Sequence, residues 1–267
     1  MFFRVKIKGL LKRKERMKMA QGKWIDDKLY SEYLKEELDL IIYLPPDFSH
    51  LYKYPLFIVQ DGKDYFQFGK LAHFSDELVE KDEMEKAIFI GVPYKTVTDR
   101  REKYHPEGSQ NDAYVKFLAR ELLPYVEDRF PSYQMAASRF LMGDSLGAAV
   151  SLQTALRYPH TFGNVILHSP FMDDSLLTAA KKADPAKLKI YHVIGSKETD
   201  VHTTDDQQAD FLTPNLAFTK VLTAKGFEHR SQVFEGDHKW KYWQPLVKDA
   251  LRYMLAANEL DLESMHV

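Results

Sequence analysis

Residues 138–148 read SRFLMGDSLGA, and residues 143–147 within them have the pattern Gly-Asp-Ser-Leu-Gly. The apolar residues 140–142 predict a buried strand, and the small residues after Gly147 predict the start of a helix. A strand, a sharp turn with a central serine and a helix form the context in which G-x-S-x-G carries a nucleophile. We therefore expect an α/β fold in which Ser145 stands at the carboxyl edge of a central sheet.

The residue types in this motif suit a nucleophilic serine. Gly143 and Gly147 remove side chains that would collide with the adjacent strand and helix. The first amides of the following helix point toward the serine, so the amide of Leu146 is expected to bind an oxyanion. A second donor is expected from the loop after an earlier strand, in PLFIVQDGKD (residues 55–64). We assign it to the backbone of Gly62, and a simple strand-end turn is the alternative.

Short apolar runs alternate with helical patterns on both sides of the motif. Their β-branched and aromatic residues predict strands buried on both faces, as a parallel sheet requires. Strands are expected at residues 40–44, 56–60, 87–92, 139–142, 164–168, 188–194 and 231–234, and helices at residues 112–130, 147–158, 215–225 and 243–258. This order predicts a mostly parallel central sheet flanked by helices. Pro124 is expected to bend the first helix, and the polar segment 94–111 is long enough to line a site.

The position of His238 distinguishes it from the other nine histidines. It follows the strand expected at residues 231–234, within EGDHKWKYWQP (residues 235–245), and precedes the last helix. In such folds the general base comes last in the chain, after the nucleophile and the acid. His192 is expected to pack in the core, and His168 to orient the motif from the end of its strand.

The acid that orients the base is expected after the strand at residues 188–194. Gly-Ser-Lys-Glu-Thr-Asp follows as residues 195–200. We prefer Glu198, because it lies three residues beyond the glycine that ends the strand, and Asp200 remains the alternative. Asp205 and Asp206 are expected to cap the next helix instead.

Composition narrows the class of protein further. The chain of 267 residues has no cysteine, which excludes disulfides, thiolate zinc sites and a cysteine nucleophile. Its formal net charge of −2 does not favour nucleic acid as a partner. No apolar run approaches the roughly 20 residues of a membrane helix. Metal-ligand spacing and phosphate-binding glycine loops are also missing from the sequence, so we expect no metal or organic cofactor. The expected location of the protein is cytoplasmic.

Residues 1–20 differ from the rest of the chain in charge. They contain eight Lys and Arg against one Glu. We expect them to form a basic extension, followed by a single α/β domain at residues 21–267. Contact with an anionic membrane or with nucleic acid is the less favoured interpretation of the extension.

Three segments together resemble one family: GDSLGA (residues 143–148), IGSKETD (194–200) and GDHKWKYWQP (236–245). They are similar to the esterase family of the α/β-hydrolases, the group of S-formylglutathione hydrolases, feruloyl esterases and enterochelin-type siderophore esterases. KYPLFIVQDGKDYF (53–66) and YVKFLARELLPYVEDRFP (114–131) extend the resemblance. It implies that Ser145 is the nucleophile, that His238 is the base, and that Glu198 takes a position usually held by an Asp.

The expected function is a serine carboxylic ester hydrolase that forms an acyl-enzyme. Its substrate is expected to be a small-molecule ester, of an aromatic, catecholate or siderophore-like kind. An acyltransferase, a thioesterase and an inactive binding module of the same fold are the alternatives. Lys63, Lys95, Arg100 and Arg101 are expected either to form a cationic rim that favours anionic esters or to be solvated charges.

Overall fold

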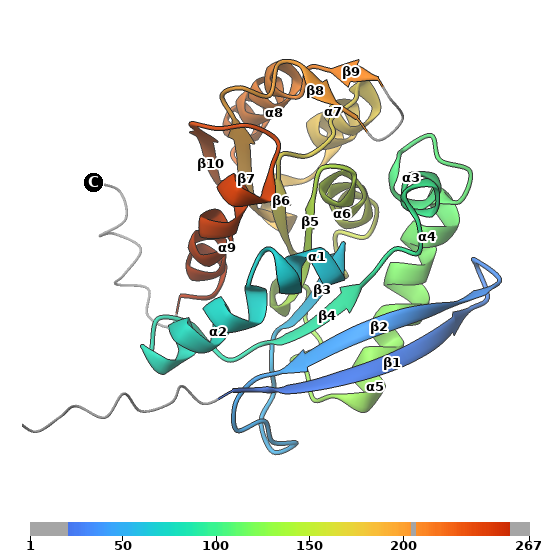
Figure 1. Ribbon diagram of the computed structural model, residues 1–267, viewed down its shortest axis with the longest axis vertical. Helices are drawn as coiled ribbons and strands as arrows, with labels where there is room; N and C mark the ends of the chain where they lie inside the picture. The colour runs from blue at the N-terminus through green and yellow to red at the C-terminus, as the bar shows by residue number, and fades with distance from the viewer. Residues whose placement is uncertain (1–20, 204–206, 257–267) are drawn as a thin grey trace, which may run out of the picture.

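An eight-stranded sheet organises residues 21–203 and 207–256, which are the residues that the computed structural model describes (Figure 1). The strand order is β1-β2-β4-β3-β5-β6-β7-β10, and only the β1–β2 and β2–β4 pairs are antiparallel. The predicted, mostly parallel central sheet is therefore confirmed. The strands are β1 (Lys23–Ser31), β2 (Glu36–Leu44), β3 (Leu56–Gln60), β4 (Ile88–Val92), β5 (Arg139–Asp144), β6 (Asn164–His168), β7 (Lys189–Gly195) and β10 (Glu228–Phe234).

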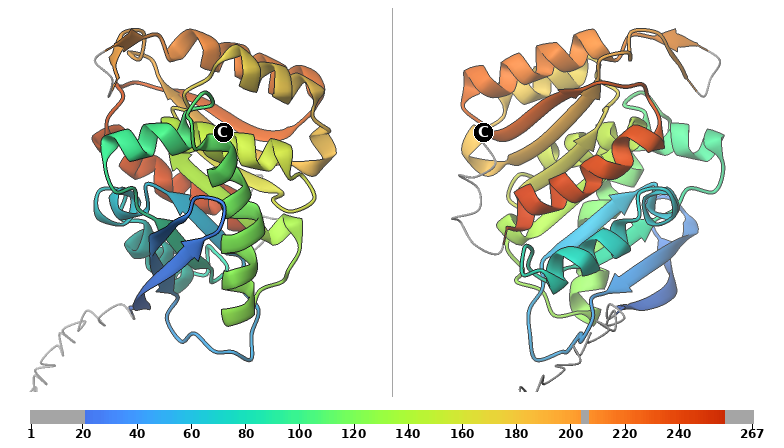
Figure 2. Two further views of the ribbon diagram at one scale, coloured as in Figure 1. Left: turned by 90° about the vertical axis from the view of Figure 1, so that its right-hand side faces the viewer. Right: turned by 60° about the vertical axis from the view of Figure 1, so that its left-hand side comes forward.

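Helices cover both faces of this sheet (Figure 2). One face packs against α1, α2 and α9, and the other against the helices from α4 to α8. The helices are α1 (Gly62–Gln67), α2 (Leu71–Glu80), α3 (Val97–Tyr104), α4 (Asn111–Phe117), α5 (Leu123–Arg129), α6 (Leu146–Arg157), α7 (Asp174–Lys182), α8 (Leu212–Lys225) and α9 (Trp240–Leu255). A short hairpin of β8 (Val201–His202) and β9 (Gln208–Ala209) stands apart from the main sheet.

The central strands are buried on both faces, which explains their continuous apolar sequences. All five residues of β3 are buried. Leu56 and Ile58 belong to the core under α4, α5 and α6, whereas Phe57 and Val59 belong to the core under α1, α2 and α9. A strand with two buried faces cannot alternate polar and apolar residues, so β3 is recognisable from its apolar composition.

The antiparallel edge strand β1 was not predicted. Its residues alternate between exposed and half-buried positions, and Trp24, Asp26, Lys28 and Tyr30 are exposed. An edge strand with one solvated face has no continuous apolar run, which is the signal that identified the other strands. The prediction for segment 94–111 was also incomplete, because it contains helix α3.

The helix predicted at residues 112–130 is interrupted where Pro124 was expected to bend it. A π-helical turn at Leu118–Leu122 separates α4 from α5, and Pro124 lies in the first turn of α5. Proline lacks the N–H that would continue the α-helical hydrogen bonds, and its ring collides with the preceding turn. The wider turn therefore accommodates the proline without ending the helix.

Some expectations concern residues outside the described ranges. These are the basic extension at residues 1–20, the capping residues Asp205 and Asp206, and the end of the last predicted helix at residues 257–258. In the part of the chain that the structure describes, no helix is long and apolar enough to cross a bilayer.

Candidate active site

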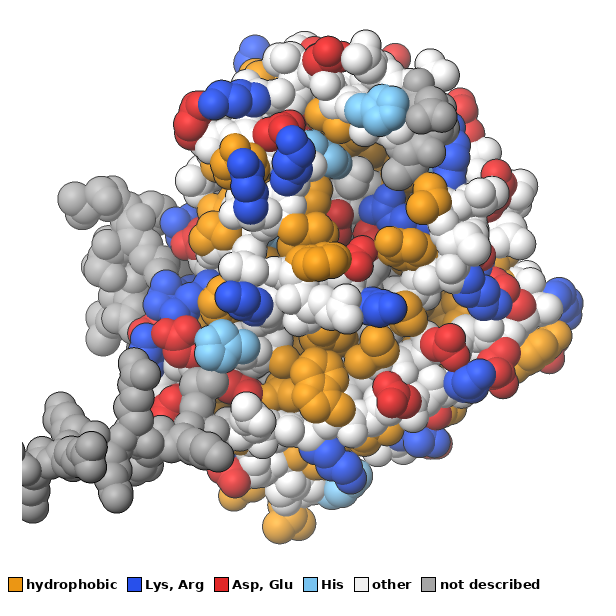
Figure 3. All heavy atoms as spheres, viewed as in Figure 1, with side chains coloured by type: hydrophobic (Ala, Val, Ile, Leu, Met, Phe, Trp, Pro, Cys, Tyr) orange, Lys and Arg blue, Asp and Glu red, His pale blue; other side chains and the backbone are white. Residues whose placement is uncertain are grey.

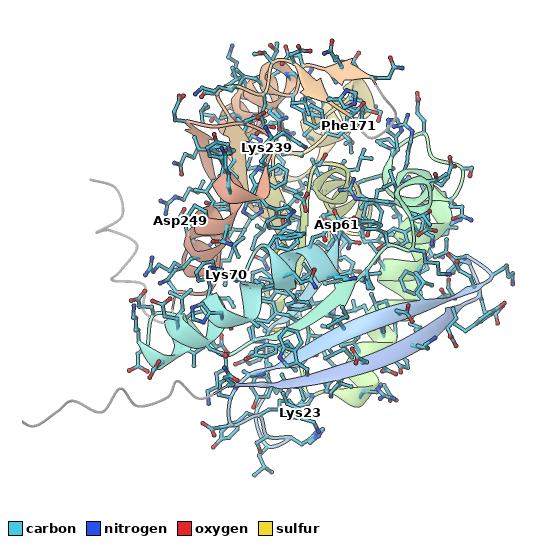
Figure 4. The ribbon with its side chains drawn as sticks, in the orientation of Figure 1. Lys23, Asp61, Lys70, Phe171, Lys239 and Asp249 are labelled. Carbon is cyan, nitrogen blue, oxygen red and sulfur yellow. The ribbon has the colours of Figure 1, made fainter. Side chains whose placement is uncertain are left out.

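The candidate residues come from loops at one edge of the sheet. β3, β5, β6, β7 and β10 run parallel, so their carboxyl ends lie at the same edge. Asp61 follows β3 and Phe171 lies just beyond β6, and both are marked in Figure 4. Ser145, Glu198 and His238 follow β5, β7 and β10 at the same edge. Residues far apart in the sequence thus meet because of the strand topology.

Ser145 occupies a sharp, strained turn between β5 and α6. Its backbone has φ 53° and ψ −119°, a conformation that residues with side chains rarely adopt. The amide of Ser145 donates to the carbonyl of His168 at 2.9 Å, and the amide of Phe171 donates to the carbonyl of Ser145 at 3.0 Å. The end of β6 therefore holds the turn from both sides, in line with the orienting position expected for His168.

The two glycines of the motif are required by close packing. A Cβ added to Gly143 would lie 2.3 Å from the backbone carbon of Gly147. A Cβ added to Gly147 would lie 2.7 Å from a carboxylate oxygen of Asp61 and 3.1 Å from the Cβ of Gln60. Helix α6 thus approaches strands β5 and β3 closely enough to exclude side chains at both positions.

Glu198 contacts His238, whereas Asp200 does not share this position. Nδ1 of His238 lies 2.6 Å from Oε2 of Glu198, and the Glu198 side chain is fully buried. Asp200, the alternative acid, is exposed to solvent. A buried carboxylate therefore contacts Nδ1 of His238, the contact by which an acid can orient an imidazole.

Ser169 and the amide of Gly195 hold Glu198 from its other side, and the sequence did not indicate this role for either. Oε1 of Glu198 accepts a hydrogen bond from the Ser169 hydroxyl at 2.6 Å and one from the Gly195 amide at 2.8 Å. The indole Nε1 of Trp243 donates to the Ser169 hydroxyl at 3.0 Å. The motif His-Ser-Pro at residues 168–170 gave no signal for this role, because the contact depends on β6 and β7 being neighbours.

The two backbone donors expected for an oxyanion hole both begin helices. Leu146 is the first residue of α6 and Gly62 the first of α1. Leu146 lines the same cavity as Ser145, and the described lining does not include Gly62. Close packing against β4 explains why residue 62 is a glycine, because an added Cβ would lie 2.3 Å from the Cα of Gly91. The oxyanion roles of both amides stay predictions.

A buried ion pair supports the loop before Gly62. Arg100 donates from Nε to Oδ1 of Asp61 at 2.8 Å and from Nη2 to Oδ2 at 2.6 Å. Arg100 Nη2 also donates to the carbonyl of Asp144 at 3.3 Å. Burial opposes the guanidinium charge, but Asp61 outweighs it and raises the pKa of Arg100. Arg100 therefore remains a cation that joins this loop to the residue before Ser145.

A second carboxyl lies beside this pair. Burial, followed by repulsion from Asp61, raises the pKa of Asp144 well above its ordinary value, although Arg100 opposes the shift. The side chain of Asp144 is 6% exposed. These conditions favour the neutral form of Asp144, since one guanidinium compensates only one carboxylate.

Ser145 and His238 line one cavity of about 180 Å³. Its apolar walls come from Leu146, Phe171, Val201, Ala209 and Phe211, and its polar lining from Arg100, Arg101, His105, His202, Thr203 and Gln207. Figure 3 shows the face with this opening, where hydrophobic and basic side chains border a hollow in the upper half of the view. Three of the lining residues belong to segment 94–111, as expected of a segment that lines a site. His105 was not singled out within this segment, because no motif around it assigns it a role.

The cationic rim expected from four basic residues is largely absent from this cavity. Arg100 is neutralised by Asp61. Lys95 forms an ion pair with Glu36, and Lys63 lines a separate depression beside β1 and β2. Only Arg100 and Arg101 of the four line the cavity of Ser145. An anionic substrate therefore has much less support from these side chains than the sequence suggested.

The buried histidines outside the candidate triad are neutral. Burial lowers the pKa of His168 to about 3, and its Nδ1 lies 2.9 Å from the hydroxyl of Tyr65. Burial likewise lowers the pKa of His192 to about 4, and its Nε2 lies 2.8 Å from Oδ1 of Asn215. His192 is fully buried, as expected of a core residue. Within residues 21–203 and 207–256, no group of three or more His, Asp or Glu is arranged to hold a metal ion.

Comparison with known families gives one match that covers most of the chain. The model of the esterase family, described as "Putative esterase", matches residues 31–254. A Bacillus subtilis (strain 168) protein, "Uncharacterized protein YjcH", is 51% identical over 231 residues, which cover 86% of this chain and 96% of that protein. The "Iron(III) salmochelin esterase" of Escherichia coli O6:H1 is 23% identical over 227 residues, covering 77% of this chain and 52% of that protein.

Solved structures share the fold at low sequence identity. A ferulic acid esterase superposes with a TM-score of 0.74 at 19% identity, covering 88% of this chain and 98% of that one. The enterobactin esterase of Shigella flexneri, solved in the presence of 2,3-dihydroxy-N-benzoyl-glycine, superposes with a TM-score of 0.72 at 19% identity. That match covers 87% of this chain and 59% of the Shigella chain.

Proposed function

The chain belongs to the esterase family and is an ester-bond hydrolase, and we propose that Ser145, His238 and Glu198 form its catalytic triad. One observation carries this proposal. Ser145 stands at a strained turn and lines the same cavity as His238. Nδ1 of His238 lies 2.6 Å from Oε2 of the buried Glu198. Nucleophile, acid and base also follow each other along the chain in the order expected for this fold.

The proposed reaction has two acyl-transfer steps. The Oγ of Ser145 attacks the ester carbonyl while Nε2 of His238 takes the proton of the Ser145 hydroxyl. The proton then passes from His238 to the leaving alcohol. Water next attacks the acyl-enzyme and gives a proton to His238, which passes that proton to Ser145 Oγ as the bond to the acyl group breaks and the acid leaves. The amide of Leu146, with that of Gly62 as the proposed second donor, stabilises the oxyanion by about 3–4 kcal/mol per donor. Glu198 holds His238 in the tautomer that accepts the proton.

We propose an ester with a single aromatic ring as the substrate. Phe171 and Phe211 supply an apolar wall, and the volume of about 180 Å³ is below the roughly 300–1,000 Å³ of typical drug-sized ligand sites. The ferulic acid esterase, and the enterobactin esterase solved with 2,3-dihydroxy-N-benzoyl-glycine, are consistent with an aromatic group in the substrate. A catecholate ester is the more specific form of this proposal, and a siderophore-like ester would place one of its rings in the cavity. We also retain a cytoplasmic location and the single domain at residues 21–267 as proposals.

The first experiment compares the wild type with Ser145→Ala. Both are assayed on p-nitrophenyl esters of acetate and of benzoate, and both are treated with a serine-directed phosphonate before peptide mapping by mass spectrometry. Turnover and labelling at Ser145 in the wild type, with both lost in the variant, support the proposal. A wild type that neither turns over nor labels would contradict it and favour the binding-module interpretation. Adding an alcohol acceptor separates hydrolysis from acyl transfer, and a matched thioester tests thioesterase activity.

A further inference from the structure

A chain of hydrogen bonds leads from the indole of Trp243 to the imidazole of His238. Trp243 Nε1 donates to the Ser169 hydroxyl at 3.0 Å, and that hydroxyl lies 2.6 Å from Oε1 of Glu198. Oε2 of the same carboxylate lies 2.6 Å from Nδ1 of His238. Ser169 and Glu198 are fully buried, and Trp243 is 3% exposed. Water therefore does not substitute for any of these contacts.

The backbone of Ser169 is strained in a way that favours a functional reason for its position. Its φ is 45°, in the left-handed region that residues with a side chain rarely adopt. Its amide donates to the carbonyl of Val193 on the neighbouring strand at 2.8 Å. This conformation places the hydroxyl between Trp243 and Glu198. Strain of this kind persists where surrounding contacts fix it, and it is common at active sites.

The direction of each hydrogen bond in the chain follows from the indole. An indole N–H can only donate, so the oxygen of Ser169 must accept from Trp243. The hydroxyl hydrogen is then free to point to Oε1 of Glu198, which also accepts from the Gly195 amide at 2.8 Å. These two hydrogen bonds hold Oε1 as an acceptor and orient Oε2 of the same carboxylate toward His238. The proton of the contact with Oε2 is assigned to Nδ1 of His238, which donates to the carboxylate.

We propose that Ser169 and Trp243 are positioning residues that set the tautomer of His238 through Glu198. This inference rests on the proposed catalytic function of Ser145 and His238. With the proton on Nδ1, the lone pair of the imidazole is on Nε2, the atom that accepts the proton of Ser145. Ser169 acts on catalysis through the orientation of the carboxylate. Trp243 acts through its hydrogen bond to Ser169, and its ring also packs edge-on against the His238 ring.

Trp243→Phe and Ser169→Ala test this inference most directly. Phe retains an aromatic ring edge-on to the His238 ring, whose centroid lies 4.8 Å from that of Trp243, and it removes the N–H donor. Trp240→Phe is the matched control, because it keeps an aromatic ring beside Tyr65, Phe68 and Trp243 and leaves the hydrogen bond from Trp243 to Ser169 in place. Thermal unfolding of all variants checks that each is folded, and Trp243→Phe carries the test if Ser169→Ala does not fold.

The readouts are the kinetic constants for p-nitrophenyl benzoate and the low-field proton resonance of His238 Nδ1–H. We expect kcat to fall about tenfold in Ser169→Ala, which loses a hydrogen bond to a carboxylate, and about fivefold in Trp243→Phe, which loses one to a neutral hydroxyl. KM should stay within about twofold of the wild type in both. The double variant should be no slower than Ser169→Ala, since both residues act in one chain. The resonance should weaken or shift upfield in both variants and persist in Trp240→Phe.

Two results would overturn the inference while the proposed function stands. One is an active wild type whose Trp243→Phe and Ser169→Ala variants retain kcat within about twofold. The other is a change in KM alone, with the His238 resonance intact. If the wild type itself is inactive, the proposed function fails, and the resonance still tests whether Trp243 and Ser169 order the contact between Glu198 and His238.

Discussion

Asp61 and Arg100 form a bidentate ion pair in the interior, with N–O distances of 2.8 and 2.6 Å. Asp61 is 1% exposed and Arg100 9% exposed. Because Asp61 ends β3 and Arg100 belongs to α3, the pair fixes the loop before Gly62 against the helix that borders the cavity. Arg100, which the sequence suggested as a ligand for anionic substrates, is thus engaged by the protein itself.

Arg100→Gln is expected to destabilise the protein strongly. The change leaves Asp61 charged and buried without its partner, which costs about 3–5 kcal/mol of unfolding free energy. Arg101→Gln is the control and should cost below about 1 kcal/mol. Urea unfolding measures both values. If the double variant Asp61→Asn, Arg100→Gln costs the sum of the two single changes, the pair is not coupled as proposed.

Glu198→Gln is expected to reduce kcat by about 10²–10⁴-fold, with little change in stability. The amide keeps the shape of the side chain but no longer supplies a negative charge to His238. Asp200→Asn changes an exposed carboxylate near the same loop and should retain wild-type kcat. Steady-state kinetics on p-nitrophenyl benzoate compare the two. Equal losses would assign the role of the acid to neither residue alone.

Gly147→Ala is expected to disturb both stability and reactivity. The new Cβ would lie 2.7 Å from Oδ2 of Asp61, so the ion pair with Arg100 must shift. A control is Gly226→Ala at the end of α8, where φ is 76° but no atom lies within 4 Å of the added carbon. That control bears only backbone strain, about 1–2 kcal/mol. Phosphonate labelling of Ser145 should slow in Gly147→Ala alone, and equal labelling in both variants would refute the packing argument.

Phe211→Ala is expected to raise KM for an aromatic ester more than for an acetate ester. Phe211 lines the cavity, and its ring centroid lies 6.0 Å from that of Phe171 and 4.6 Å from that of His238. Losing one aromatic contact should cost an aromatic substrate about 0.5–1.5 kcal/mol more than acetate. The ratio of kcat/KM for p-nitrophenyl benzoate and acetate measures the effect. An unchanged ratio would argue against an aromatic substrate in this cavity.

The free energy of unfolding is expected to decrease as the pH is lowered below about 6.5, because two buried histidines are neutral in the folded protein. Burial lowers the pKa of His168 to about 3 and that of His192 to about 4 in the folded protein. In the unfolded chain both bind protons below about 6.5, so acid favours unfolding. The two together should cost about 3 kcal/mol between pH 6.5 and pH 5, because the slope for each residue rises toward about 1.4 kcal/mol per pH unit as the unfolded chain becomes protonated.

Urea unfolding between pH 5 and pH 7 measures this dependence. His192→Gln preserves a donor to Asn215 and should reduce the slope that the two histidines contribute by about half. His160→Gln changes an exposed histidine and should leave the slope as it is in the wild type. A slope that is the same in His192→Gln as in the wild type would show that His192 is not neutral and buried as described.

The central strands and the turn at Ser145 could be predicted because their signals are local. Every residue of β3 is buried, and four of its five residues are apolar. The turn at Ser145 requires glycine on either side. His238 could be singled out by its place after a late strand. β1 and α3 could not, because their polar residues face solvent or form ion pairs and leave no apolar pattern.

By itself, the sequence determined the fold class, the seven apolar strands of the central sheet, and the preference for Ser145, His238 and Glu198, but not β1 or the helices α1, α2, α3 and α7. These depend on backbone sterics and on burial, which short segments express directly. Only the tertiary structure decided that Glu198 rather than Asp200 contacts His238, that Ser169 and Trp243 hold it, and that Arg100 is paired with Asp61. Such contacts join separate strands and helices, so they arise from strand order and packing, which no local pattern specifies.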